Sequence, residues 1–152
     1  MIVFRLSKSR FSKDLSGRGA ELAGGRWNSK GLPMLYTSSS RALCTAEIAV
    51  HSPLGIVPMD YEIIEIEIPD SSIQIIQVNQ LPGNWKQFPH QNFTKKLGDE
   101  FLKNNEFLVL KVPSAVVSGD FNYLINPFHT IFSEIKIIKI EPFEFDRRLF
   151  VR

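Results

Sequence analysis

Cysteine is almost absent from this chain of 152 residues, which contains Cys44 alone and therefore cannot form an internal disulfide. Its apolar neighbours Leu43 and Ala46 indicate a small buried side chain rather than a reactive thiol. Long hydrophobic runs are missing too, since no stretch approaches the ~18 apolar residues of a membrane span. The first residues also lack the apolar region of a signal peptide. We therefore expect no membrane association and a cytoplasmic location.

An excess of one charge is also lacking. Lys and Arg number 18 against 16 Asp and Glu, which gives a net charge of +2. That balance is too even for general binding to nucleic acid, although a local basic pocket is compatible with it. Apolar residues make up 43% of the chain and include twelve Phe, so a core can form. We expect one domain spanning residues 1–152.

The usual motifs for metals and phosphates are absent as well. His51, His90 and His129 are far apart and show neither HExxH nor CxxC spacing, so no metal site is expected. The glycines are not followed by a Walker Gly-Lys-Ser/Thr and do not form GxGxxG. A Ser-His-acid hydrolase stays open, because such triads assemble in space and need no fixed spacing. Ser114, which follows Pro113, could serve as its nucleophile or simply form a turn.

The hydrophobic pattern predicts an α+β protein with about seven strands and two helices. The helices do not alternate with the strands, which argues against a Rossmann-like parallel sheet. A glycine-rich loop is expected over residues 7–31. Strands are expected over residues 2–6, 34–37, 61–68, 73–78, 106–112, 121–125 and 133–140, and helices over 40–51 and 93–103.

The stretch from Gly17 to Glu47 carries the strongest functional signal. Five of the nine glycines of the chain fall within its first 15 residues. Glycine lets the backbone approach a ligand closely. Arg26 follows the last pair, Gly24-Gly25, and an arginine fork beside bare backbone suits a phosphate or carboxylate.

The predicted 40–51 helix is apolar nearly all round and should therefore be buried. Glu47 is the one acidic residue in its middle, and burial would raise the pKa of that carboxyl. His51, one turn later, is a possible local partner. Perturbed carboxylates are frequent at functional sites, although structural ion pairs with Arg26 or Arg5 would also account for Glu47.

Four residues therefore stand out: Arg26, Tyr36, Glu47 and Ser114. They suit an enzyme that cleaves or transfers from a dinucleotide. The arginine would hold a pyrophosphate or ribose, and the tyrosine would stack on a flat base. The glutamate would stabilise a sugar cation as its glycosidic bond breaks.

The sequence resembles a known family at these residues. Gly-Gly-Arg-Trp-Asn-x-x-Gly (24–31), Leu-Tyr-Thr-Ser (35–38), Val-Pro-Ser (112–114) and Asn-Tyr-Leu-Ile-Asn-Pro-x-His (122–129) resemble the RES-domain toxins of bacterial RES–Xre toxin–antitoxin pairs. The resemblance implies a fold similar to ADP-ribosyltransferases of the diphtheria-toxin type, with a split mixed sheet and few helices. It implies an enzyme that degrades NAD+ and releases nicotinamide, which arrests growth. The acceptor would be water or inorganic phosphate, with no other cofactor.

The resemblance also implies site residues and a partner. Arg26, Tyr36, Glu47 and Ser114 match the family's catalytic positions, with Ser118 as the other option for the serine. Gly25, Trp27 and Asn28 would join Arg26 and Tyr36 in binding NAD+. A cognate Xre-type antitoxin with a helix-turn-helix would cover the site, and a homodimer is an option. Two alternatives remain: mono-ADP-ribosylation of a host protein, and a non-catalytic domain that binds NAD+ or the antitoxin. Asn122, Asn126 and His129 are expected to serve as turn and scaffold residues.

Overall fold

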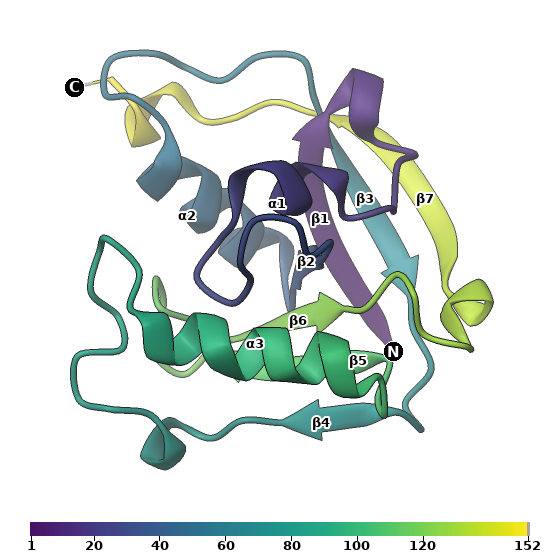
Figure 1. The fold of residues 1–152 in the computed structure, drawn as a ribbon. Coiled ribbons are helices and arrows are strands. Elements are labelled where there is room, and N and C mark those ends of the chain that lie inside the picture. Colours follow the sequence, from purple (N-terminus) through teal and green to yellow (C-terminus); the bar gives the residue numbers. More distant parts are fainter. Residues whose placement is uncertain (152) are drawn as a thin grey trace.

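A computed structural model describes residues 1–151 as one curved sheet with helices packed around it (Figure 1). The described residues form seven strands and three α-helices, joined in places by short 3-10 turns. The strands are β1 Ile2–Lys8, β2 Leu35–Ser38, β3 Tyr61–Glu67, β4 Ile73–Ile75, β5 Val109–Pro113, β6 Phe121–Ile125 and β7 Lys136–Phe143. The helices are α1 Arg18–Ala23, α2 Arg41–His51 and α3 Asn92–Asn104, and the 3-10 turns are η1 Ser9–Phe11, η2 Val78–Gln80, η3 Phe132–Glu134 and η4 Arg147–Leu149.

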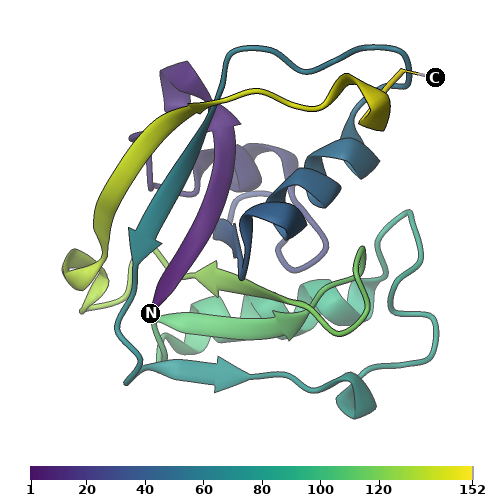
Figure 2. The same cartoon turned by 180° about the vertical axis from the view of Figure 1, so that it is seen from behind.

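The sheet is mixed and nearly divided in two. Its strand order is β4-β5-β6-β2-β1-β3-β7, and β4 with β5 is the parallel pair. β1 meets β2 at a single residue pair, Phe4 with Ser38, whereas β1 pairs with β3 along its whole length. Figure 2 shows β1, β3 and β7 running across the direction of β5 and β6. The predicted α+β class, with a split mixed sheet and few helices, is confirmed.

The predicted long loop over residues 7–31 is wrong in its middle, where α1 forms. Ala20 to Ala23 favour a helix, and a glycine with positive φ stands at each end: Gly17 at 72° and Gly24 at 71°. The glycines therefore mark the ends of a short helix rather than a continuous loop. The sequence pattern of residues 7–31 did not predict where this helix begins and ends.

Helix α2 matches its predicted bounds but is less buried than expected. Ser40 caps it, because the Ser40 hydroxyl accepts a hydrogen bond from the Leu43 amide at 3.0 Å. Only Leu43 and Cys44 are fully buried on this helix, and Val50 is 62% exposed. The apolar face that points away from the sheet borders a cleft instead of more protein. Cys44 is buried, as predicted.

Two clusters of buried side chains hold the structure together. One fills the sheet around β1, β3, β5 and β6. The other lies between α3 and the sheet and contains Trp27, Trp85 and Phe101. In the second cluster Trp27 packs against Trp85, with ring centres 6.2 Å apart. This contact anchors the Gly-Gly-Arg-Trp segment. No helix within residues 1–151 is long and apolar enough to cross a membrane.

Candidate active site

A cleft of about 1370 Å³ opens between α2, the edge of β1 and β2, and the irregular segment 81–91. It is larger than the ~300–1,000 Å³ typical of small-molecule sites, so a dinucleotide would fit. Arg26, Tyr36 and Glu47 all line it, as do Gly25 and Trp27. The structure therefore brings these five predicted residues of the 24–47 stretch to one cleft, while Asn28 is not part of its lining.

Arg26 does not contact Glu47 but holds the segment opposite it. The Arg26 guanidinium donates to the backbone carbonyls of Trp85 at 2.7 Å, Gln87 at 3.2 Å and Lys86 at 3.3 Å. Burial lowers the pKa of Arg26, but such a group stays charged at neutral pH. The arginine fork therefore fixes one wall of the cleft. Its predicted grip on a phosphate stays a prediction.

Tyr36 belongs to a hydrogen-bond network behind that wall. Its hydroxyl donates to Asn28 Oδ1 at 2.6 Å and accepts from the Trp27 amide at 3.1 Å. Asn28 is fully buried, and its amide donates to the carbonyls of Ala20 at 2.8 Å and Leu32 at 3.0 Å. The side-chain groups of Asn28 are thus engaged within the protein and Asn28 is not among the residues that line the cleft, so its predicted contact with NAD+ stays a prediction.

Gly25 is a glycine because of this network. A Cβ on Gly25 would lie 2.6 Å from the Tyr36 hydroxyl and 3.0 Å from Asn28 Oδ1. Any side chain there would displace both groups. The Gly-Gly-Arg-Trp-Asn motif is thus a packing requirement as well as a possible ligand surface.

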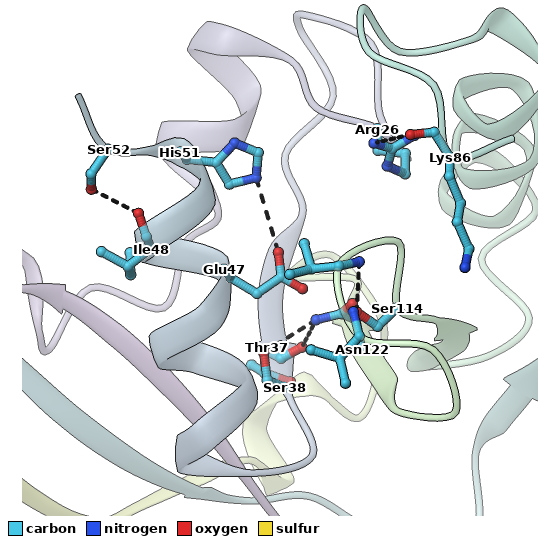
Figure 3. Close-up of polar contacts among 12 residues, drawn as sticks. Arg26, Thr37, Ser38, Glu47, Ile48, His51, Ser52, Lys86, Ser114 and Asn122 are labelled. Atoms are coloured by element: carbon cyan, nitrogen blue, oxygen red, sulfur yellow. Dashed lines mark hydrogen bonds and ion pairs between the residues drawn. The ribbon is translucent and has the colours of Figure 1, made fainter. Parts of the chain in front are cut away.

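Glu47 projects from α2 toward Asn122, with His51 on the next turn (Figure 3). His51 is its one ion-pair partner among residues 1–151, with Nε2 4.0 Å from Glu47 Oε2. Burial raises the pKa of Glu47, while the Asn122 amide, His51 and Arg26 oppose that rise. The structure therefore does not show the ion pair with Arg26 or Arg5 that was the structural alternative for Glu47.

Ser114 lies close to this group but its hydroxyl is engaged. The Ser114 Oγ accepts from the amides of Val116 at 3.1 Å and Val117 at 3.0 Å, and the side chain is 2% exposed. It shapes the turn that presents Ala115 and Val116 to the cleft. Ser118 is exposed on the same turn. These bonds give Ser114 a structural role in the turn, and its predicted catalytic role stays a prediction.

Asn122, Arg5 and His90 are three polar residues of the cleft that were not among the predicted site residues. Asn122, expected to be scaffold, lines the cleft beside Glu47. Arg5 enters it from β1, with one hydrogen bond, from Nη1 to the Phe11 carbonyl at 3.3 Å. A lone arginine inside an otherwise apolar strand was the signal for Arg5. His90 lines the cleft from the 81–91 segment, where sequence pattern offers no signal.

Comparisons with known proteins agree with this architecture. The structure is similar to a chain in the crystal structure of the M. tuberculosis MbcT-MbcA toxin-antitoxin complex, with a TM-score of 0.76 and 19% identity over 94% of this chain and 84% of that one. This likeness shows a shared α+β fold.

Sequence likeness defines the family. Residues 2–146 match the RES domain. The chain is 36% identical over 152 residues to Toxin Res of Yersinia enterocolitica, covering 98% of this chain and 99% of that one. It is also 36% identical over 139 residues to the Prs ADP-ribosylating toxin of Sphingobium sp., covering 90% and 86%. The protein belongs to the RES-domain family of toxins.

Proposed function

We propose that this toxin consumes NAD+ by breaking the bond between nicotinamide and its ribose. The observation that carries the proposal is the position of Glu47. It is a partly buried carboxylate that faces a dinucleotide-sized cleft and has no Lys or Arg ion-pair partner among residues 1–151. Such a group can stabilise positive charge that develops on a bound sugar.

The cleft offers complementary groups for the rest of the dinucleotide. Arg5 has guanidinium donors left over for the diphosphate, because it makes one hydrogen bond to protein. The Tyr36 ring lines the cleft and would pack on the nicotinamide. Arg26 would act by holding the opposite wall, and Ser114 by shaping the turn beside Asn122.

The reaction would begin with departure of the leaving group. The C1′–N bond of the nicotinamide ribose breaks, and its electron pair leaves with nicotinamide, which becomes neutral. The ribose gains oxocarbenium character, which the ionised Glu47 stabilises. Water or inorganic phosphate then adds to C1′, and the proton it loses goes to solvent. Glu47 must be ionised for this role, and Asn122, His51 and Arg26 each act to lower the pKa that burial raises.

A partner that covers the cleft would control this activity. Apolar side chains stand exposed around its rim, namely Leu22 and Val50 at 62% each and Phe88 at 76%. Exposed apolar groups around a functional opening are typical of an interaction site. We propose a cognate antitoxin of the Xre type as the partner, with the pair acting in the cytoplasm.

Transfer of ADP-ribose to a protein is the second candidate. The Sphingobium relative is named as an ADP-ribosylating toxin, at 36% identity. Both reactions use the same nicotinamide cleavage and differ only in the acceptor. The site residues therefore serve either outcome.

The test is to incubate the pure protein with NAD+, with and without phosphate, and to identify the products by mass spectrometry. We expect nicotinamide with ADP-ribose or its 1″-phosphate. Glu47→Gln should lower the rate by ~10²–10³, the usual effect of losing a well-placed electrostatic group. Glu100→Gln, on the exposed face of α3, is the matched control and should leave the rate unchanged. Binding of NAD+ without turnover by the unaltered protein would instead show a non-catalytic domain.

The acceptor is identified in a parallel reaction. The protein is mixed with NAD+ labelled in its adenylate part and with cell lysate. Label on a protein band in amounts matching the nicotinamide released would establish transfer. Label that stays in small molecules would establish hydrolysis or phosphorolysis.

A further inference from the structure

The segment between β4 and α3 is held over the cleft rather than hanging free beside it. Arg26 binds three successive carbonyls of this segment, at residues 85, 86 and 87. Trp85 is buried against Trp27, and the Gln91 amide donates to Gln87 Oε1 at 2.9 Å across the turn. These contacts fix the backbone on both sides of Phe88. What the segment presents to the cleft is therefore set by the fold.

His90 is one of two polar residues of this segment that line the cleft, the other being Lys86. Its ring meets Phe88 edge to face, with centres 5.2 Å apart, and both residues line the cleft. Its Nδ1 is the one buried side-chain nitrogen or oxygen among residues 1–151 without a hydrogen-bond partner. Buried polar atoms in folded proteins are nearly always paired, so an unpaired nitrogen on a residue that lines the cleft is a candidate to bind a ligand group.

The surroundings of His90 decide how it would bind. Arg26, Lys95 and His51 are its charged neighbours, and burial together with their positive charge lowers the pKa of His90. The ring is therefore neutral at physiological pH. A neutral imidazole has one N–H and one lone pair, so in the tautomer with the proton on Nε2 the Nδ1 atom accepts a hydrogen bond. The matching ligand group is an N–H or O–H donor.

The order of groups along the cleft decides which part of the ligand lies there. Arg5 has Asp14 as its charged neighbour, whereas Glu47 and His90 share Arg26 and His51. Figures 1 and 2 show segment 81–91 at one side of the molecule, away from the more central strand β1, which carries Arg5. If the diphosphate lies at Arg5 and the reacting C1′ at Glu47, the nicotinamide extends toward His90.

We propose that His90 is a substrate-binding residue whose Nδ1 accepts a hydrogen bond from the carboxamide N–H₂ of the nicotinamide. This inference rests on the proposed function, because it assumes that NAD+ occupies the cleft. His90 would thereby recognise the leaving group and distinguish a carboxamide from other substituents on the pyridine ring. A site that accepts a substrate hydrogen bond rejects an analogue without it, because the protein atom is then left unpaired.

The test compares NAD+ with its 3-acetylpyridine analogue, in which a methyl group replaces the carboxamide N–H₂ and the carbonyl is kept. We expect the unaltered protein to favour NAD+ in kcat/KM by ~3–10-fold, the effect of one neutral hydrogen bond. His90→Phe keeps an aromatic ring on Phe88 but has no acceptor, so it should process the two substrates equally. His90→Asn offers an amide oxygen near the position of Nδ1 and should restore part of the preference.

Gln91→Ala is the control for the order of the segment. It removes the side-chain bond to Gln87 without altering Nδ1, so the preference for NAD+ should persist. Loss of the preference in this variant as well would overturn the inference, because the effect would then come from loop order. An unchanged preference in His90→Phe would overturn it too, while cleavage of NAD+ would still support the proposed function. Failure of the unaltered protein to release nicotinamide from either substrate would overturn the proposed function and the inference together.

Discussion

The guanidinium of Arg26 donates to the backbone carbonyl of Trp85 at 2.7 Å, across 59 residues of sequence. This bond links the Gly-Gly-Arg-Trp motif to the segment that forms the far wall of the cleft. A motif that resembles an anion clamp therefore has a second use, which is to fix the geometry of an irregular segment. Glu47 is left facing the cleft without an arginine partner, because that arginine is engaged elsewhere.

Loosening this bond should free the segment. Arg26→Lys keeps the charge but has no planar fork, so it cannot reach three carbonyls at once. We expect faster amide hydrogen exchange over residues 81–91 and a loss of about 1–3 kcal/mol in the free energy of unfolding. Exchange is measured by mass spectrometry on peptic fragments. Arg10→Lys, at an exposed arginine, is the control, and equal exchange in both variants would contradict the role of Arg26.

The hydrogen bonds of Tyr36 lead to a second prediction, which concerns the stability of variants at Gly25. Gly25→Ala places a methyl group 2.6 Å from the Tyr36 hydroxyl and should lower the free energy of unfolding by about 1–3 kcal/mol. Gly19→Ala is the matched change, because Gly19 lies in α1 and the new Cβ would have no atom within 4 Å beyond its chain neighbours and the helix's own backbone. It should raise stability by about 0.5–1 kcal/mol, as alanine favours a helix. Thermal unfolding of the two variants checks the opposite signs.

The parts of the site that could be predicted from sequence are those that depend on local pattern. The Ser40 cap and the apolar spacing after it place α2, and α2 places Glu47. Tyr36 follows from a short strand bounded by Pro33. Both signals lie within a dozen residues of the group they position, so neither needs knowledge of the tertiary fold.

What could not be predicted depends on contacts between distant backbone atoms. The carbonyls that bind Arg26 belong to an irregular segment. Every residue has a backbone carbonyl, so the sequence does not show which carbonyls will bind an arginine. His90 is visible in the sequence, but its unpaired Nδ1 exists only once the segment is folded. Helix α1 was not predicted, because the glycines around it indicate a loop more strongly than the short run Ala20 to Ala23 indicates a helix.

Ser114 should prove structural in a direct comparison with Ser118. Ser114→Ala leaves the amides of Val116 and Val117 without their acceptor, at a cost of about 1–2 kcal/mol in stability. Ser118→Ala, at an exposed position, should stay within ~0.5 kcal/mol of the unaltered protein. Urea unfolding gives both values. A Ser114→Ala protein that keeps full stability yet loses nicotinamide release would show direct contact with the substrate instead.

The pH dependence of cleavage should report the ionisation of Glu47. Burial raises the pKa of this carboxyl above its ordinary value of 4.5, and the reaction needs the ionised form. Activity should therefore fall as pH is lowered through that raised pKa, at a higher pH than an exposed glutamate would give. The measurement is kcat/KM for NAD+ against pH, with stability followed over the same range.

A substitution of Asn122 tests whether the fall in activity at low pH reports the ionisation of Glu47. The Asn122 amide favours the ionised carboxylate, so Asn122→Ala removes a group that lowers the pKa of Glu47. The fall in kcat/KM at low pH should therefore move to higher pH. The rate at higher pH, where Glu47 is ionised, should change less. Asn122 also donates to Ser38 Oγ at 3.1 Å, so Ser38→Ala controls for the loss of that tie between β6 and β2. A fall in kcat/KM that stays at the same pH in Asn122→Ala, or moves equally in Ser38→Ala, would assign the titration to a group other than Glu47.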